Sequence, residues 1–334
     1  MFLSVVLLLL GFIMLVKGAD WFVDGAAGLA AKIKIPELVI GLTVVAFGTS
    51  APELAVSVSS AIKGVVDVII GNVIGSNIIN ILLILGVSAV FTALPVNKNL
   101  RKIDFPVLIG VSILFILFGA FDNQLGRVEG VIMVLLLVAY TAFLVWNGLR
   151  ARKSIEDGGM PELKPVEGEE KTGKFKAWYA RMKQKTWFLG VITVVGLVLI
   201  VWGADIAVNA ATDIARELKI SERIIGLTVV AIGTSLPELV TSVTAAIKGK
   251  TDIAVGNVVG SNIFNILMVT GFSAAIIPLE FSSAFVVDAC IALFAAVLLA
   301  ALGYLPTKKI ERWGGVLMLV CTVGYFVYLF LLPV

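Results

Sequence analysis

Two glutamates lie inside long apolar stretches of this sequence, where a charged side chain is costly. Glu53 belongs to "GLTVVAFGTSAPEL" (41–54) and Glu238 to "GLTVVAIGTSLPEL" (226–239), each directly after a proline. An ionised glutamate at the centre of a bilayer costs about 2.5–3.5 kcal/mol on insertion scales, and two that face each other repel. A bound cation relieves both penalties, so the pair predicts a cation site at membrane depth.

Oxygen ligands accompany each glutamate. Pro52 and Pro237 cannot donate a backbone hydrogen bond, so each is predicted to break its helix and to free carbonyl groups nearby. Freed backbone groups at membrane depth are tolerated where they line a cavity within the protein. The threonine four residues before each glutamate shares its helix face. The expected ligand groups are the hydroxyls of Thr49, Ser50, Thr234 and Ser235 and the carbonyls of Ala46, Gly48, Ala231 and Gly233.

A second polar element follows in each half, "GNVIGSNIINIL" (71–82) and "GNVVGSNIFNIL" (256–267). Its amides and hydroxyls can ligate a cation without adding charge, and with the glutamates they could supply the roughly 6–8 oxygens that Ca²⁺ prefers. The chain has no histidine, and both cysteines lie in apolar spans, so soft or imidazole metal sites are not expected. The polar residues of the two elements are Asn72, Ser76, Asn77, Asn80, Asn257, Ser261, Asn262 and Asn265.

These elements also carry pairs of glycines four residues apart, Gly71/Gly75 and Gly256/Gly260. Pairs of small residues at this spacing are typical of close helix packing in membranes. Packing is therefore their predicted role.

The composition identifies an integral membrane protein. The chain is 59% hydrophobic and 15% charged, with a mean hydropathy of +1.05, whereas soluble domains are about 45–50% apolar and about 25% charged. A spanning helix needs about 20 apolar residues. The predicted fold is all-α, with ten transmembrane helices near 1–16, 38–62, 68–94, 105–121, 128–147, 187–208, 224–247, 253–278, 284–305 and 313–333.

The two halves of the chain repeat each other at an offset of 185 residues. Across 41–86 and 226–271, which hold the expected ion-binding residues, about two-thirds of the aligned residues are identical. Each half, 1–148 and 187–334, holds five predicted spans. An odd number inverts the second half in the membrane, an arrangement found in secondary transporters with a site near the midplane.

Basic residues predict the orientation. If the polar linker 149–186 is cytoplasmic, most Lys and Arg residues lie in cytoplasmic loops, as the positive-inside rule requires. Both termini are then outside a cell (plasma) membrane. The first apolar run lacks a basic start and an obvious cleavage site, so we expect it to remain as a span. The basic aromatic part of the linker could form a helix along the membrane surface.

Charged residues also recur near the first and sixth spans. Asp20 and Asp205 occupy equivalent positions, and Lys17 precedes the first of them. All three lie toward the ends of the predicted spans. A structural or vestibular role is therefore expected.

The paired elements "GTSxPEL" and "GNxxGSNIxNI" resemble those of sodium/calcium exchangers of the cation/calcium exchanger superfamily, and the chain is most similar to the short prokaryotic type. The resemblance implies an ion pathway through the second, third, seventh and eighth spans, with the first and sixth sliding against the rest. It implies a central Ca²⁺ site at Glu53, Glu238, Thr49 and Thr234, supported by Asn80 and Asn265, and flanking Na⁺ sites at Ala46, Ser50, Ser76, Ala231, Ser235 and Ser261. Many of these exchangers carry Asp where this chain has Asn265, and the double-Asn pattern also occurs in proton/calcium exchangers.

The expected function is secondary active antiport of Ca²⁺ for Na⁺ by alternating access through one shared site. A proton/calcium exchanger using the same glutamates is the alternative, and a cation channel is a more remote one. The sequence contains no "GxxxxGK[ST]" loop, so no nucleotide-binding site is expected. The net charge of +3 reflects the membrane topology rather than nucleic-acid binding. No cofactor is expected. An intramembrane hydrolase lacks a His or Ser–Lys pair, so no enzyme is expected. A structural scaffold would tolerate Glu53→Gln. A monomer in the lipid bilayer, with Ca²⁺ and Na⁺ as its partners, is the simplest expectation.

Overall fold

The computed structural model describes residues 2–158, 182, 185–218 and 231–331, and these residues are mostly helical. The first half contains α1 (Phe2–Ile33), α2 (Glu37–Ile40), η1 (Gly41–Val45), α3 (Ala46–Thr49), α4 (Ala51–Lys63), α5 (Val66–Ile78), η2 (Ile79–Leu85), α6 (Gly86–Phe91), β1 (Leu94–Pro95), η3 (Leu100–Asp104), α7 (Phe105–Phe121), β2 (Gln124–Leu125) and α8 (Arg127–Gly158), where η marks π-helical segments. The second half contains α10 (Thr186–Glu217), α12 (Ala231–Thr234), α13 (Leu236–Ile247), α14 (Thr251–Phe264), η5 (Asn265–Thr270), α15 (Gly271–Ile276), β3 (Leu279–Glu280), α16 (Ser283–Tyr304), β4 (Lys309–Ile310) and α17 (Arg312–Leu331).

Eight helices within the described ranges are long and apolar enough to cross a membrane, and a bent pair of helices makes a ninth candidate. The pair joins Glu37–Thr49 to Ala51–Lys63 at an angle of 44°. The predicted seventh span, 224–247, begins outside the described residues, and only α12 and α13 represent it. α8 continues to Gly158, ten residues into the segment expected to be a linker, and the expected surface helix of that linker lies outside the described residues.

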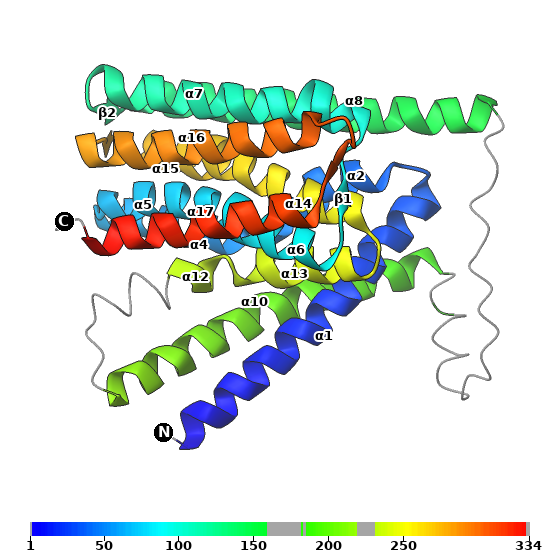
Figure 1. Cartoon of the computed structure of the whole chain (residues 1–334), viewed down its shortest axis with the longest axis horizontal. Helices are drawn as coiled ribbons and strands as arrows, with labels where there is room; N and C mark the ends of the chain where they lie inside the picture. Colours follow the sequence, from blue (N-terminus) through cyan, green and yellow to red (C-terminus); the bar gives the residue numbers. More distant parts are fainter. Residues whose placement is uncertain (1, 159–181, 183–184, 219–230, 332–334) are drawn as a thin grey trace.

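The helices α1 and α10 are longer than the apolar runs that predicted them. The first span was expected at 1–16 and the sixth at 187–208, whereas each helix has 32 residues. The placement of Asp20 and Asp205 toward the span ends was therefore wrong, because both lie well inside a continuous helix. Figure 1 shows α1 and α10 packed against each other and inclined relative to the other helices of the bundle.

Glycines allow this pair to touch backbone to backbone. A Cβ on Gly18 of α1 would lie 2.8 Å from the carbonyl oxygen of Gly196 in α10. A Cβ on Gly203 of α10 would lie 2.9 Å from the carbonyl oxygen of Gly11 in α1. Only glycine permits approaches this close. Gly196 and Gly203 follow Gly11 and Gly18 by the repeat offset, so the two halves meet here through equivalent positions.

Two short ribbons cap the opposite ends of the bundle. β1 pairs with β4 and β2 pairs with β3, both antiparallel. The two ribbons are equivalent under the repeat offset of 185 residues. Leu94 corresponds to Leu279 and Leu125 to Ile310, so the Leu94–Ile310 pair corresponds to the Leu279–Leu125 pair. The start of α1 and the end of α17 both lie at the β2–β3 end in Figure 1.

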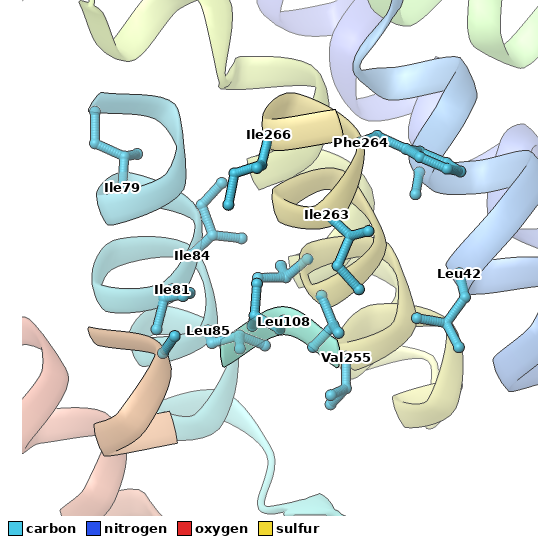
Figure 2. Close-up of a cluster of buried hydrophobic side chains, with 14 of the residues drawn as sticks. Leu42, Ile79, Ile81, Ile84, Leu85, Leu108, Val255, Ile263, Phe264 and Ile266 are labelled. Atoms are coloured by element: carbon cyan, nitrogen blue, oxygen red, sulfur yellow. The ribbon is translucent and has the colours of Figure 1, made fainter. Parts of the chain in front are cut away.

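The centre of the bundle consists of α5–η2 and α14–η5. Figure 2 shows Ile84 of η2, Ile263 of α14 and Ile266 of η5 in one buried cluster, with Leu42 of η1 on another side of α14. Of the spans, the window of α14 to α15 is the only one buried throughout among those the structure describes. The polar elements of both halves are therefore held at the interior of the protein.

The two glycine pairs differ in their surroundings. A Cβ on Gly256 would lie 3.0 Å from the Leu38 carbonyl oxygen, and one on Gly260 would lie 2.7 Å from the Ala46 Cβ, so this pair packs against the second span as predicted. Gly75 has no atom within 4 Å of its ideal Cβ position, and the only neighbour of Gly71 is the Phe285 ring at 4.0 Å. The packing prediction is confirmed for the second pair only.

Candidate cation site

Both glutamates lie in the first turn of a helix that follows a break. Ser50 ends α3 with φ −84° and ψ 3°, and Ser235 precedes α13 with φ −92° and ψ 7°. The predicted breaks at the two proline segments are therefore present. A carboxylate in a first helical turn is favoured by the exposed N–H groups and the helix dipole. Each break thus places Glu53 or Glu238 where a local positive potential supports its charge.

The backbone at the first break is less free than the sequence indicates. The Ala46 carbonyl oxygen accepts a hydrogen bond from the Ser50 N–H at 3.0 Å, and the Thr49 hydroxyl lies 3.4 Å from it. A carbonyl has two lone pairs, so one acceptor position remains beyond the Ser50 bond. Ala231, its counterpart, is the first residue of α12, and its side chain lies outside the described part of the structure.

The carboxylates are fully buried and only partly hydrogen-bonded. Glu53 is 1% exposed and Glu238 is 0% exposed, and they interact electrostatically with each other. The Ser50 hydroxyl donates to Oε1 of Glu238 at 3.2 Å. Oε2 of Glu238 and both carboxylate oxygens of Glu53 have no hydrogen-bond partner. A buried carboxylate without partners is strongly destabilising unless it is protonated or meets a cation.

Hydroxyl groups from both halves meet around the glutamates. The Thr49 hydroxyl donates to Oδ1 of Asn257 at 3.0 Å and lies 3.4 Å from the Ser261 hydroxyl. On the other side, the hydroxyls of Ser235 and Ser76 are 3.4 Å apart. Residues from the two halves of the chain therefore share one polar centre.

Four asparagines form a network between α5–η2 and α14–η5. Asn77 and Asn262 donate to each other's backbone carbonyls at 3.4 Å. Asn80 donates to Oδ1 of Asn262 and Asn265 donates to Oδ1 of Asn77, each at 3.2 Å. The amide nitrogens of Asn80 and Asn265 are thereby committed to protein partners. Their Oδ1 atoms have none, although both are buried.

Three hydroxyl residues near the site were not among the predicted ligands. Asn72 donates to the Ser57 hydroxyl at 3.1 Å and Asn257 to that of Ser242 at 2.9 Å, while the buried Thr241 hydroxyl has no partner. Ser57 and Ser242 follow the glutamates by four residues. The helical spacing that identified the preceding threonines would have found them as well.

The donor set fits a hard cation. Within the described ranges no three His, Cys, Asp or Glu residues cluster, so a cation here would be held by two carboxylates and neutral oxygens. Oxygen ligands of this kind suit Ca²⁺ and other hard cations rather than zinc or copper. Around the two glutamates, buried oxygens without hydrogen-bond partners belong to Glu53, Glu238, Asn80, Thr241 and Asn265.

A cavity of about 440 Å³ leads to this centre from the β2–β3 end. Asn72, Ser76 and the half-buried Thr234 line its inner part. Its wall also holds Asp288, a residue that the sequence analysis did not single out and whose Oδ1 has no hydrogen-bond partner. Ser76 is buried like its counterpart Ser261, whereas Asn72 is partly exposed and its counterpart Asn257 is fully buried. The polar residues are therefore more accessible from the β2–β3 end than from the β1–β4 end.

Comparison with known proteins identifies the family. The family model described as sodium/calcium exchanger protein matches residues 3–146 and 188–332. The chain belongs to the sodium/calcium exchanger family. This family membership confirms the resemblance drawn from the repeated motifs. It also makes the protein a member of a transporter family rather than of an enzyme family.

Relatives and solved structures agree with this assignment. The chain is 34% identical to the sodium/calcium exchanger MaX1 of Methanosarcina acetivorans, with 97% of each chain covered. It is 35% identical to the inner membrane protein YrbG of Escherichia coli, over 99% of this chain and 97% of that protein. Its structure matches the sodium-calcium exchanger NCX_Mj with a TM-score of 0.81 and 32% identity, covering 98% and 99% of the two chains.

Proposed function

We propose that the protein is a secondary active antiporter that exchanges Ca²⁺ for Na⁺ through one central site. The observation that carries the proposal is the buried pair of Glu53 and Glu238, with three carboxylate oxygens that have no partner. The relatives add independent support, because MaX1 is named as a sodium/calcium exchanger and NCX_Mj was studied with both ions. In this proposal Ca²⁺ and Na⁺ are the transported substrates, and no resident cofactor is needed.

The central Ca²⁺ would be held by Glu53 and Glu238 with Thr49 and Thr234, and the oxygens of Asn80 and Asn265 would support it. Na⁺ would use flanking oxygens on both sides of the centre. The short distances between hydroxyls of opposite halves, such as Ser235 to Ser76 at 3.4 Å, support these positions. The proposed flanking groups are Ala46, Ser50, Ser76, Ala231, Ser235 and Ser261.

The two halves would form inverted repeats of five spans each, ten in all, with the boundaries 1–148 and 187–334. The two ribbons support this arrangement, because the repeat offset exchanges them at opposite ends of the bundle. Two inverted copies of one element create a site that either side can reach in turn. The excess of basic residues would place the β1–β4 end and the 149–186 linker in the cytoplasm and both termini outside.

Coupling would follow from charge. With one Ca²⁺ or at least two Na⁺ ions bound, the carboxylate pair is neutralised and the loaded protein can change sides. The empty site would retain buried charges without partners, which is unfavourable within the membrane. The empty protein would therefore rarely complete the change of side, and one ion would have to replace the other.

Proton/calcium exchange is the second candidate. The carboxylate oxygens of Glu53, which have no partners, favour it equally, because a proton satisfies a buried carboxylate as a cation does.

The deciding experiment is ⁴⁵Ca²⁺ uptake into proteoliposomes loaded with Na⁺, compared with vesicles that have only an outward proton gradient. Uptake that requires internal Na⁺ supports the sodium/calcium exchanger. Uptake driven by protons alone assigns the glutamates as proton carriers, and uptake without any counter-ion would overturn antiport in favour of a channel.

A further inference from the structure

An ion-pair cluster joins the second half of the chain to α1 at the β1–β4 end. Lys248, at the end of α13, places its Nζ 2.6 Å from Oδ1 of Asp20 and 2.7 Å from Oδ1 of Asp24, and donates to the Asp20 carbonyl oxygen at 2.8 Å. The Lys248 side chain is 24% exposed, that of Asp24 is 25% exposed and that of Asp20 is 43% exposed, so the pair with Asp24 is the more shielded from solvent. The two aspartates lie one helical turn apart, and one lysine bridges them.

Two of these three charged residues have charged counterparts in the opposite half of the chain. The repeat offset relates Lys248 to Lys63, at the end of α4, and Asp20 to Asp205 of α10. Lys63 and Asp205 are both exposed, and neither forms an ion pair in the described part of the chain. Accordingly, α13 packs closely against α1, whereas α4 makes no comparable contact with α10. The ion pair is therefore formed at one end of the molecule and open at the other.

The packing around the centre shows the same difference. At the β1–β4 end, Gly256 and Gly260 lie tight against the second span. At the β2–β3 end, the region of Gly71 and Gly75 borders the cavity. The closed end is thus the end with the formed ion pair. The open end is the one where lysine and aspartate are apart.

We propose that Lys248–Asp20/Asp24 and Lys63–Asp205 are alternating locks, each formed only when its own end of the pathway is closed. The inference rests on the proposed alternating access, because an inverted repeat converts one end into the other by exchanging equivalent contacts. In the opposite state, α4 packs against α10, the Lys63–Asp205 pair forms, and the Lys248 pairs separate. These residues position the helices and do not touch the transported ions.

The two locks differ in strength. The counterpart of Asp24 is Asn209, so Lys63 finds one carboxylate where Lys248 finds two. Partly exposed ion pairs contribute modestly, which suits a contact that must break in every cycle. The extra carboxylate favours the state in which the β1–β4 end is closed, and this is the state that the structure shows.

Cysteine cross-linking tests the proposal in the full-length protein in liposomes. Cys290 and Cys321 are first replaced by Ala, and Lys63→Cys is then combined with Asp205→Cys. A bifunctional thiol reagent of short span should join this pair with low yield, because the structure holds its members apart. Asp20→Cys with Lys248→Cys serves as the positive control, since these side chains are in contact.

The deciding step adds Lys248→Gln to the 63/205 pair. Loss of two ion pairs at the closed end should raise the 63/205 cross-linking yield about two- to tenfold. The matched control is Lys102→Gln, which removes one exposed positive charge that has no ion pair among the described residues, and it should leave the yield unchanged. An unchanged yield with Lys248→Gln, or an equal increase with Lys102→Gln, would overturn the lock.

The readout needs no transport, so it separates the lock from the proposed function. If the 63/205 cross-linking yield rises with Lys248→Gln but the protein shows no ion exchange, the alternating contacts are supported and the proposed antiport is refuted. Ca²⁺ exchange by the wild-type protein, with no cross-linking at 63/205 for any reagent length, would keep the antiport and refute the lock.

Discussion

Ser50 and Glu238 belong to different halves of the chain, yet the Ser50 hydroxyl donates to Oε1 of Glu238 at 3.2 Å. No counterpart of this hydrogen bond joins Ser235 to Glu53, whose carboxylate oxygens are both without partners. Ser235 instead lies 3.4 Å from Ser76. The two equivalent breaks therefore have different hydrogen bonding.

Ser50→Ala should weaken cation binding while the protein still folds. The substitution removes the hydroxyl that donates to Oε1 of Glu238, and hydrogen bonds to charged groups contribute about 1.5–3 kcal/mol. We expect at least about a tenfold rise in the Ca²⁺ concentration that gives half-maximal exchange, measured by ⁴⁵Ca²⁺ flux. Ser273→Ala is the control, because the Ser273 hydroxyl is buried without a partner. Equal Ca²⁺ dependence of the two variants would show that Ser50 is not part of the site.

Glu53→Gln and Glu238→Gln should each abolish Ca²⁺ exchange. Each change keeps the shape of the side chain but removes one of the two charges that would neutralise the ion. Because it also removes a buried charge that is not fully hydrogen-bonded, thermal unfolding in the absence of Ca²⁺ should occur at the same or a higher temperature. Glu280→Gln, an exposed glutamate of β3, is the matched control and should exchange normally. Wild-type flux from either site variant would refute the assignment.

The sequence predicted the helical membrane fold and the buried polar centre because both depend on local, repeated patterns. Proline favours the first turn of a helix, so Pro52 and Pro237 indicated that Glu53 and Glu238 begin new helices. The 185-residue offset likewise indicated which residues are equivalent. These features need no knowledge of how the helices are arranged.

The conformational state could not be predicted, because equivalent sequences have different environments in the folded chain. Gly260 packs against Ala46, while Gly75 of the same motif has no neighbour at its Cβ position. The lengths of α1 and α10 were also missed, since Asp20 and Asp205 interrupt the apolar runs but do not end the helices. Asp20 finds a partner in Lys248. Such partners come from distant segments and leave no local signal.

Ca²⁺ should stabilise the protein against thermal unfolding, and a chelator should reverse the effect. An ion that binds only the folded state adds about 2.7 kcal/mol at a concentration of 100 times Kd. The measurement is the unfolding temperature of the purified protein in detergent, with a Ca²⁺ series and then excess chelator. Glu53→Gln should show little or none of this shift. A shift of the same size in that variant would place the Ca²⁺ at another site.

Gly260→Ala and Gly75→Ala form a matched pair that tests the closed and open ends. A Cβ on Gly260 would lie 2.7 Å from the Ala46 Cβ and 2.9 Å from the Leu42 carbonyl oxygen, closer than real contacts allow, so α14 or η1 must shift. Gly75 has free space, and alanine also favours the helix by about 1 kcal/mol relative to glycine. We expect Gly260→Ala to lower the unfolding temperature and Gly75→Ala to leave it unchanged or raise it.

If alternating access closes the β2–β3 end around Gly75, Gly75→Ala should still slow Ca²⁺ flux. A Gly75→Ala protein with normal stability and normal flux would show that this surface is never packed during transport.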